Sequence, residues 1–385
     1  MKKILSLTLG CLLALGTGVC AVCAKTEAAD ASLSPRFGAD GKFTILHISD
    51  PQDDMYPAKQ LKGFLEKAIA LSEPDIIVFG GDTVEDSRIG DLGVDEQNLR
   101  EGVKDDKDYA KTLENTKKAC DNIFSLINDK KIPFVFTQGN NDYKCIENED
   151  WLKIYSSYEY CLMKDESDDE EGRLDCHIPI LSSDGERIAF NLYMIDNGKS
   201  ENPNAGQLQW YKDTSDALKA QAGEPVKSFV FEHRPIAEVG NLFVSCKPWE
   251  KGAILSGLNS YKLGKNAEGH AETYYKPGSS EQFALWKQQS DVIGAYFGHI
   301  HTDGFTGVYD GIELGLTYGC EFAKSGPYGI RVFTLDENDI MNYDNTLYVF
   351  TNGQFKKQSG NGDASLSIWL RIAAFFRRAF ASLFV

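Results

Sequence analysis

The chain has 385 residues, 42% of them hydrophobic, and a formal net charge of −17 at pH 7. This length and apolar content suffice for one large core or two modest ones, which excludes a disordered chain and indicates an enzyme-sized globular domain. The acidic balance, with no Lys/Arg cluster in the body of the sequence, argues against nucleic acid as a partner.

Residues 1–24 have the pattern of a secretory signal peptide. Lys2 and Lys3 precede an apolar run from Ile4 to Cys23, and Val22-Cys23-Ala24 offers a cleavage site. The alternative is an uncleaved membrane anchor, which the glycines and short length of the run disfavour. We therefore expect an exported protein, either secreted or held at the cell surface.

Six of the nine cysteines lie beyond this signal. An even number of cysteines in an exported chain permits disulfides, although their spacing does not fix a pairing. The six are Cys120, Cys145, Cys161, Cys176, Cys246 and Cys320.

The body of the chain begins with alternating strand-like and helical patterns. Strands are predicted at Phe43 to Ser49, Ile76 to Phe79 and Ile132 to Thr137, and helices at Ala58 to Leu71 and Tyr109 to Asn128. This order favours adjacent parallel strands with helices over one face.

A second group of elements follows an acidic segment. Leu174 to Leu181 and Arg187 to Ile195 read as a hairpin, and residues 206–221 as a helix. The further predicted strands are Ser228 to Phe231, Val292 to Phe297, Phe305 to Tyr309, Ile312 to Leu316 and Gly329 to Leu335. Two packed sheets with helices outside them fit this number of elements.

The end of the chain differs in composition from the body. Residues 356–364 have the composition of a flexible linker, and residues 365–385 form a basic, aromatic-rich amphipathic pattern. Such a helix either lies on a membrane surface or docks on the body or on a partner helix. The segments Asp86 to Lys107, Lys144 to Asp175 and Val239 to Glu281 are predicted as loops that surround the substrate.

Five of the predicted strands end at residues that can bind metal ions. Ile76 to Phe79 stops at two glycines followed by Asp82, and the carboxyl ends of strands in open α/β sheets are where ligands usually bind. Taken singly, each such residue has a plain alternative as a turn residue, a helix cap or a buried histidine. The other four strand ends supply Asp50, Asn140, His233, and His299 with His301.

In this order the blocks Asp-x-Gln, Gly-Asp, Gly-Asn-Asn-Asp, His-x-Pro and Gly-His-x-His resemble those of the calcineurin-like metallophosphoesterase superfamily, in its purple-acid-phosphatase-like branch. The resemblance spans roughly Phe43 to Leu335. It implies an α/β metallophosphoesterase fold, a four-layer αββα sandwich of two mixed β-sheets flanked by helices, in a domain at residues 35–355. It also implies a hydrolase acting on phosphoric ester bonds, whose substrate is a phosphorylated small molecule or macromolecule.

The resemblance further implies two metal ions, with an attacking hydroxide that bridges them. One metal is assigned Asp50, Gln52, Asp82 and His301, and the other Asp82, Asn140, His233 and His299. Asp82 would bridge the pair. Mixed oxygen and nitrogen ligands suit iron, manganese or zinc, and the sequence does not choose among them.

Two residues depart from the pattern of the superfamily. Gln52 replaces a histidine ligand, and Asn141 replaces the histidine that contacts phosphate and assists the leaving group. Asparagine cannot transfer a proton, and general acid catalysis is typically worth roughly 10²- to 10⁴-fold. The catalytic candidates are then Asp82, Asn141 and Asp142, the last more as an orienting or capping group than as an acid. The expectation is low activity; the alternative is an inactive metal- or phosphate-binding member of the same fold.

Two further residues stand beside these blocks. His47 lies within a predicted strand, so we expect it to be buried packing rather than part of the site. Arg234 either contacts the phosphate of the substrate or forms an exposed salt bridge, and the salt bridge is the favoured interpretation.

Overall fold

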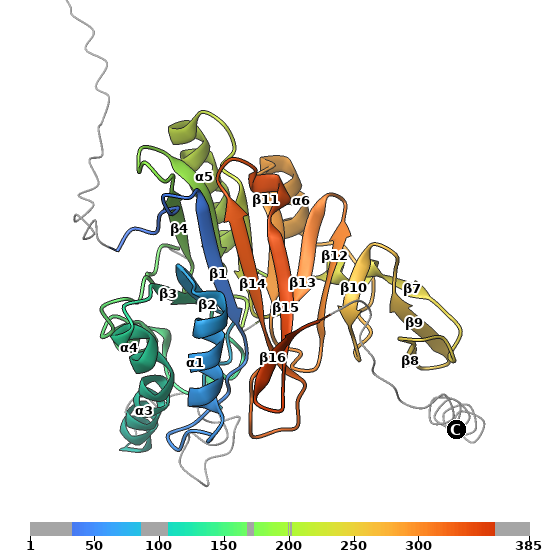
Figure 1. Ribbon diagram of the computed structural model, residues 1–385, viewed down its shortest axis with the longest axis horizontal. Coiled ribbons are helices and arrows are strands. Elements are labelled where there is room, and N and C mark those ends of the chain that lie inside the picture. The colour runs from blue at the N-terminus through green and yellow to red at the C-terminus, as the bar shows by residue number, and fades with distance from the viewer. Residues whose placement is uncertain (1–32, 86–106, 168–172, 199, 201, 359–385) are drawn as a thin grey trace, which may run out of the picture. The chain divides into compact units, whose positions relative to one another are not determined.

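Figure 1 shows a computed structural model of the protein, which describes residues 33–85, 107–167, 173–198, 200 and 202–358. The chain divides into residues 1–33 and 34–385, and the architecture below is that of the second unit. The predicted signal peptide and C-terminal amphipathic helix lie outside the described residues. Within the described ranges, no helix combines the length and apolar character needed to cross a bilayer.

One sheet has six strands and carries the first predicted elements. In spatial order they are β16 (Gln354–Lys357), β15 (Asp344–Thr351), β14 (Tyr328–Asp336), β1 (Lys42–Ile48), β2 (Ile76–Phe79) and β3 (Phe134–Phe136). β1, β2 and β3 pair in parallel, as predicted, and β14 pairs antiparallel to β1.

A second sheet has seven strands. In spatial order they are β10 (Ala267–His270), β12 (Gly304–Tyr309), β13 (Ile312–Leu316), β11 (Val292–Phe297), β6 (Ser228–Glu232), β5 (Ile188–Met194) and β4 (Cys176–Leu181). β11 pairs in parallel with both β6 and β13, while the predicted hairpin of β4 and β5 is present at the edge. The turn between β12 and β13 also forms a hairpin.

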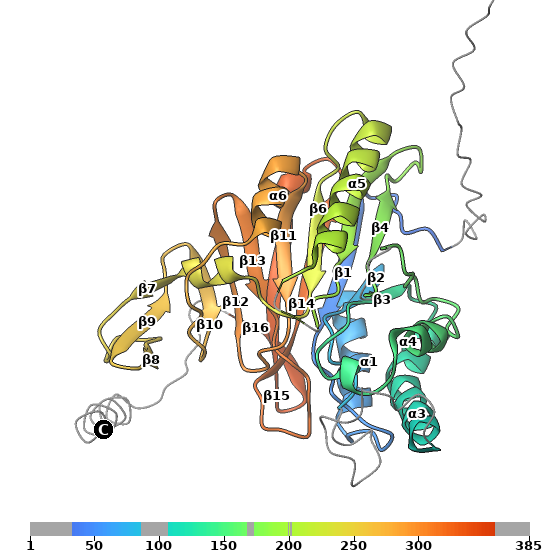
Figure 2. The ribbon, with the colours of Figure 1, turned by 180° about the vertical axis from the view of Figure 1, so that it is seen from behind.

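Helices cover the outer face of each sheet. α1 (Leu61–Ser72) and α3 (Lys107–Asp129) lie with the six-stranded sheet, and α5 (Ala205–Ala222) and α6 (Glu281–Gln289) lie over β6 and β11, as Figure 2 shows. α5 begins where Asn204 and Gln207 form a capping box. The predicted four-layer αββα sandwich is therefore confirmed.

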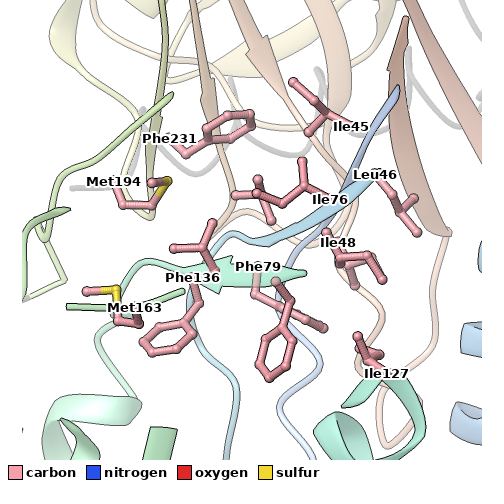
Figure 3. Close-up of a cluster of buried hydrophobic side chains, with 14 of the residues drawn as sticks. Ile45, Leu46, Ile48, Ile76, Phe79, Ile127, Phe136, Met163, Met194 and Phe231 are labelled. Atoms are coloured by element: carbon pink, nitrogen blue, oxygen red, sulfur yellow. The ribbon is translucent and has the colours of Figure 1, made fainter. Parts of the chain in front are cut away.

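The two sheets share a core of buried apolar side chains. Ile45 of β1 and Ile76 of β2 belong to the same cluster as Met194 of β5 and Phe231 of β6 (Figure 3). His47 is also fully buried, and its Nδ1 lies 2.9 Å from the hydroxyl of Thr317. The prediction that His47 is packing is confirmed.

A buried arginine joins the sheets. Arg331 of β14 donates to the hydroxyl of Thr306 at 2.6 Å and to the backbone oxygens of Phe305 at 2.9 Å and Leu316 at 2.6 Å, all at the seven-stranded sheet. On its own sheet it donates to Asn345 at 2.7 Å. A fully buried charge is tolerated when its donors are satisfied in this way.

Several segments differ from the sequence-based prediction. The segment Lys144 to Asp175 contains α4 (Asn148–Tyr155), and Asp86 to Lys107 lies almost wholly outside the described residues. The segment Val239 to Glu281 begins within η3 (Ala237–Leu242) and holds β10 and a separate three-stranded sheet of β7 (Phe243–Ser245), β9 (Asn259–Leu263) and β8 (Ile254–Ser256). These strands are too short to show a clear alternation. The sequence analysis also missed η4 (Ile340–Asn342) and the strands β15 and β16 that follow it. β16 includes Lys356 and Lys357, which belong to the predicted linker.

No disulfide joins any of the six cysteines beyond the predicted signal within the described residues. Four of them, Cys120, Cys145, Cys176 and Cys320, are buried. Buried thiols pack as small apolar side chains, so an even cysteine count did not require pairing. The disulfides that export would permit are absent from the part of the chain that the structure describes.

Candidate metal centre

The five predicted strand ends bring their polar side chains together. β1, β2 and β3 of one sheet, and β6 and β11 of the other, deliver these residues from their carboxyl ends. Two groups of side chains have ligand atoms that all lie within 4.8 Å of one another. One group is Asp82, His233 and His299, and the other is Asp50, Asp82 and His301. Asp82 belongs to both groups.

The backbone at these positions is unusual. Asp50 and Asp82 have φ of 50°, Gln52 has φ of 38° and His299 has φ of 69°, all in the left-handed region that side chains other than glycine rarely adopt. Such strain is stored where the surrounding structure holds a functional site. A Cβ atom on Gly139 would overlap the amide and carboxylate of Asp82, so only glycine lets the loops after β2 and β3 approach this closely.

His233 directs its Nε2 into the first group. Its Nδ1 lies 2.8 Å from the backbone oxygen of Gly80 and donates to it. Its Nε2 lies 3.3 Å from Asp82 Oδ2 and 3.1 Å from Asn140 Oδ1. When Nε2 carries no proton, three electron-rich atoms face one another, an arrangement that a cation between them stabilises.

His301 has the same arrangement in the second group. Its Nε2 lies 3.3 Å from Asp50 Oδ1, and its Nδ1 lies 3.1 Å from Glu321 Oε2. A carboxylate behind a metal-binding imidazole fixes its tautomer and orientation. Glu321 is a site residue that the sequence analysis missed, because it follows β13 and no pattern around it points to the other blocks.

His299 connects the first group to a nearby cation. Its Nδ1 lies 3.2 Å from His233 Nε2, and its Nε2 lies 3.3 Å from Arg234 Nη1. His299 and Arg234 are half-buried, whereas His233 and Asp82 are fully buried. The buried residues thus form the floor of the site, and the half-buried residues form its rim.

The electrostatics of the site favour bound positive charge. Burial lowers the pKa of His233 and of His301, but Asp82 raises the first to about 9, and Asp50 with Glu321 raises the second to about 10. Burial raises the pKa of Asp82, yet the charge of His233 and its hydrogen bond bring it below its usual range overall. Either protons or metal ions can supply the charge that these carboxylates attract, so metal binding would release protons.

Comparison with known proteins fits this geometry. Residues 43–303 match the family described as calcineurin-like phosphoesterase. The chain belongs to the calcineurin-like phosphoesterase family. The resemblance seen in the sequence is confirmed.

Two curated relatives come from Arabidopsis thaliana. The chain is 24% identical over 337 residues to probable inactive purple acid phosphatase 14, covering 76% of this chain and 74% of the relative. It is 22% identical over 325 residues to probable inactive purple acid phosphatase 28, covering 73% and 71%.

Similar solved structures include a dimetal phosphatase from Danio rerio, with a TM-score of 0.45 and 12% identity over 76% of this chain and 95% of that one. Another is GAP50 of Plasmodium, titled as the anchor in the inner membrane complex, with a TM-score of 0.44 and 14% identity over 88% and 94% of the two chains.

The two residues that depart from the superfamily pattern both contact Asp82. Gln52 donates its Nε2 to Asp82 Oδ2 at 3.0 Å, so its amide would have to turn for the oxygen to serve as a ligand. Asn141 donates its backbone N–H to Asp82 Oδ1 at 2.7 Å and its Nδ2 to Oδ2 at 2.6 Å. In this structure both amides therefore orient the carboxylate that the two donor groups share.

Asp142 has an orienting role. Its buried carboxylate accepts backbone N–H groups from Gly139 at 2.8 Å, Thr83 at 2.9 Å and Val84 at 3.2 Å. Burial, and then the charge of Asp82, raise its pKa. The side chain joins the loops after β2 and β3 and lies behind Asp82 rather than at the rim.

These residues fit two metal ions. Carboxylate and imidazole donors are gathered in two groups that share Asp82, and the second nitrogen of both His233 and His301 is held by a protein group. Asn140 faces His233, on the side that the family resemblance assigns to it. Such a mixed donor set suits iron, manganese or zinc.

Proposed function

We propose that this phosphoesterase-family chain binds two metal ions and hydrolyses phosphate esters that have good leaving groups. The observation that supports the proposal most directly is the membership of Asp82 in both donor groups. In the proposed assignment, Asp50, Gln52, Asp82 and His301 hold one metal, and Asp82, Asn140, His233 and His299 hold the other. The substrate is a phosphate ester, as the family implies.

Bound metals would supply positive charge to the phosphoryl oxygens and lower the pKa of a water molecule. The residues of the chain hold the metal ligands in position. Asn141 holds both oxygens of Asp82 through its backbone N–H and its side-chain amide, and Asp142 holds the loops that carry Asp82. The rim of half-buried side chains, which includes Asn140 and His299, is the face that the substrate approaches.

The leaving group receives little help. Asn141 stands where the superfamily has a histidine, and its amide is bonded to Asp82. An amide cannot give a proton to the departing oxygen, so the rate for poor leaving groups falls by roughly 10²- to 10⁴-fold. Aryl phosphates are therefore the better substrates, because their aryloxide leaving group departs without being protonated.

A second candidate function is metal or phosphate binding without turnover. Gln52 and Asn141 favour it, and two curated relatives carry names that call them probably inactive. The relatives' names describe those proteins, and a measurement on this chain separates the two functions.

The test uses metal-loaded protein with p-nitrophenyl phosphate and an alkyl phosphate. We expect measurable hydrolysis of the aryl ester and almost none of the alkyl ester. Asn141→His should raise the alkyl rate far more than the aryl rate at unchanged metal content, because an added acid matters most for a poor leaving group. No hydrolysis of either ester by the wild type, with two metals bound, would establish the binding function instead.

We also propose that the protein is exported and acts outside the cytoplasm, because residues 1–24 have the pattern of a signal peptide. The C-terminal residues 365–385 would then hold it at a membrane surface. Deleting them should release the protein from anionic vesicles in a flotation assay. Unchanged flotation would refute the membrane role.

A further inference from the structure

Arg234 is a cation at the rim of the metal centre, beside His299. Among the described residues, no Asp or Glu lies at ion-pair distance from its guanidinium, which departs from the exposed salt bridge that the sequence favoured. Its Nε donates to the backbone oxygen of Gly198 at 3.2 Å, and its Nη1 lies 3.3 Å from His299 Nε2. Within the described part of the chain, Nη2 has no hydrogen-bond partner.

The backbone of Arg234 is held in place. Its N–H donates to Asn197 Oδ1 at 2.9 Å, and its carbonyl accepts from Asn197 Nδ2 at 2.8 Å. Asn197 also donates to Glu232 Oε2 at 2.8 Å, and both of these residues are fully buried. The guanidinium is therefore presented from a rigid base at the rim, as a positioned anion-binding group requires.

The contact with His299 calls for an acceptor. If His299 binds a metal through Nδ1, which faces His233, its proton must lie on Nε2. The N–H groups of His299 Nε2 and Arg234 Nη1 would then face each other across 3.3 Å. An anionic oxygen that accepts from both groups relieves this opposition.

The charge of Arg234 also calls for an anion at this position. Asp50 and Asp82 are the carboxylates of the two donor groups, and bound metals would neutralise them, while Glu321 is paired with His301 and Lys324. The half-buried guanidinium would then lack a counter-charge, although the chain as a whole carries a net charge of −17. A planar guanidinium suits the oxygens of a phosphate group better than a point charge does.

We propose that Arg234 binds a non-bridging oxygen of the substrate's phosphate group and so provides the contact that Asn141, bonded to Asp82, does not make. The assignment rests on the proposed function for the identity of the substrate. The binding of phosphate itself can be tested without turnover.

The experiment measures the affinity of metal-loaded protein for inorganic phosphate by calorimetry, with metal content determined for each variant. Arg234→Gln should weaken phosphate binding by about 10- to 100-fold at unchanged metal content, because a charge-assisted hydrogen bond is lost. Arg234→Lys should recover part of the affinity, since it keeps the charge but not the planar fork. The control is Arg187→Gln, which removes the same charge at an exposed turn and should change affinity less than about twofold.

Wild-type affinity in Arg234→Gln, or an equal loss in Arg187→Gln, would overturn the inference. Loss of metal from Arg234→Gln would also overturn it, because the side chain would then only support His299. A wild type that hydrolyses no ester but binds phosphate in an Arg234-dependent way would refute the proposed function and support this inference.

Discussion

Removing the carboxylate of Glu321 tests whether the two donor groups bind metal independently. Glu321 is 2% exposed and its Oε2 lies 3.1 Å from Nδ1 of His301, which belongs to only one of the two donor groups. Loss of a carboxylate behind a metal-binding histidine typically weakens metal affinity by about 10- to 100-fold, or about 1.4 to 2.7 kcal/mol. Glu321→Ala should therefore weaken one metal site by this amount and leave the other near its wild-type affinity.

The assay is a titration of bound metal per chain against buffered free metal. Wild type should fill two sites, and Glu321→Ala should show one unchanged site and one shifted site. Glu321→Gln keeps an oxygen acceptor for His301, so the metal affinity of its shifted site should lie between those of wild type and Glu321→Ala. Lys324 also contacts Glu321, at 3.0 Å, but its side chain is 64% exposed, so Lys324→Gln is the control and should shift affinity less than about twofold.

Two outcomes would refute this reasoning. Equal weakening of both sites would mean that Glu321 supports the whole fold of the site and not His301 alone. Wild-type titration of Glu321→Ala would mean that His301 does not need this carboxylate, or that it does not bind metal.

Three further predictions concern stability. Metal at 100 times its Kd should stabilise wild type by about 2.7 kcal/mol per site and so raise its melting temperature, but it should not stabilise Asp82→Asn. A wild-type melting temperature that does not change when a chelator is added would contradict this. Arg331→Met leaves buried acceptors unpaired in both sheets and should lower the free energy of unfolding by about 3–5 kcal/mol in urea titrations, whereas a change under about 1 kcal/mol would show that these hydrogen bonds contribute little. Burial, and then the charge of Asp196, raise the pKa of Asp175 to about 7, so the folded state holds a proton that the unfolded state releases near pH 4. The free energy of unfolding should therefore fall between about pH 4 and pH 7, by at most about 4 kcal/mol for this group, and Asp175→Asn should reduce that fall; parallel pH profiles would contradict it.

The central strands could be predicted from sequence because burial on both faces leaves a local trace. Ile76 to Phe79 is an unbroken apolar run followed by two glycines, and β2 has these ends. The polar residues after such strands could also be predicted to meet, because parallel strands bring their carboxyl ends to one edge. The strands β7 to β9 left no such trace, since strands of three to five residues are too short for a periodic pattern.

Glu321 and Arg234 could not be placed by the same reasoning. Their importance comes from contacts with His301 and His299 that form only when distant segments pack together. An exposed salt bridge was the expectation for Arg234, because a guanidinium pairs readily with a carboxylate. Only the structure shows that, in the described part of the chain, no carboxylate lies at ion-pair distance from its guanidinium.

Asn141 has a second effect on the site that its position in the sequence does not reveal. In the sequence it appears only as the loss of an acid that could protonate the leaving group. In the structure it makes two hydrogen bonds to Asp82, one from its backbone and one from its side chain, at 2.7 and 2.6 Å. The same residue that removes proton transfer thus stabilises the carboxylate common to both donor groups. Under the proposed function, metal binding and catalytic rate would therefore be separable in this site, and these contacts favour a chain that retains the first while losing much of the second.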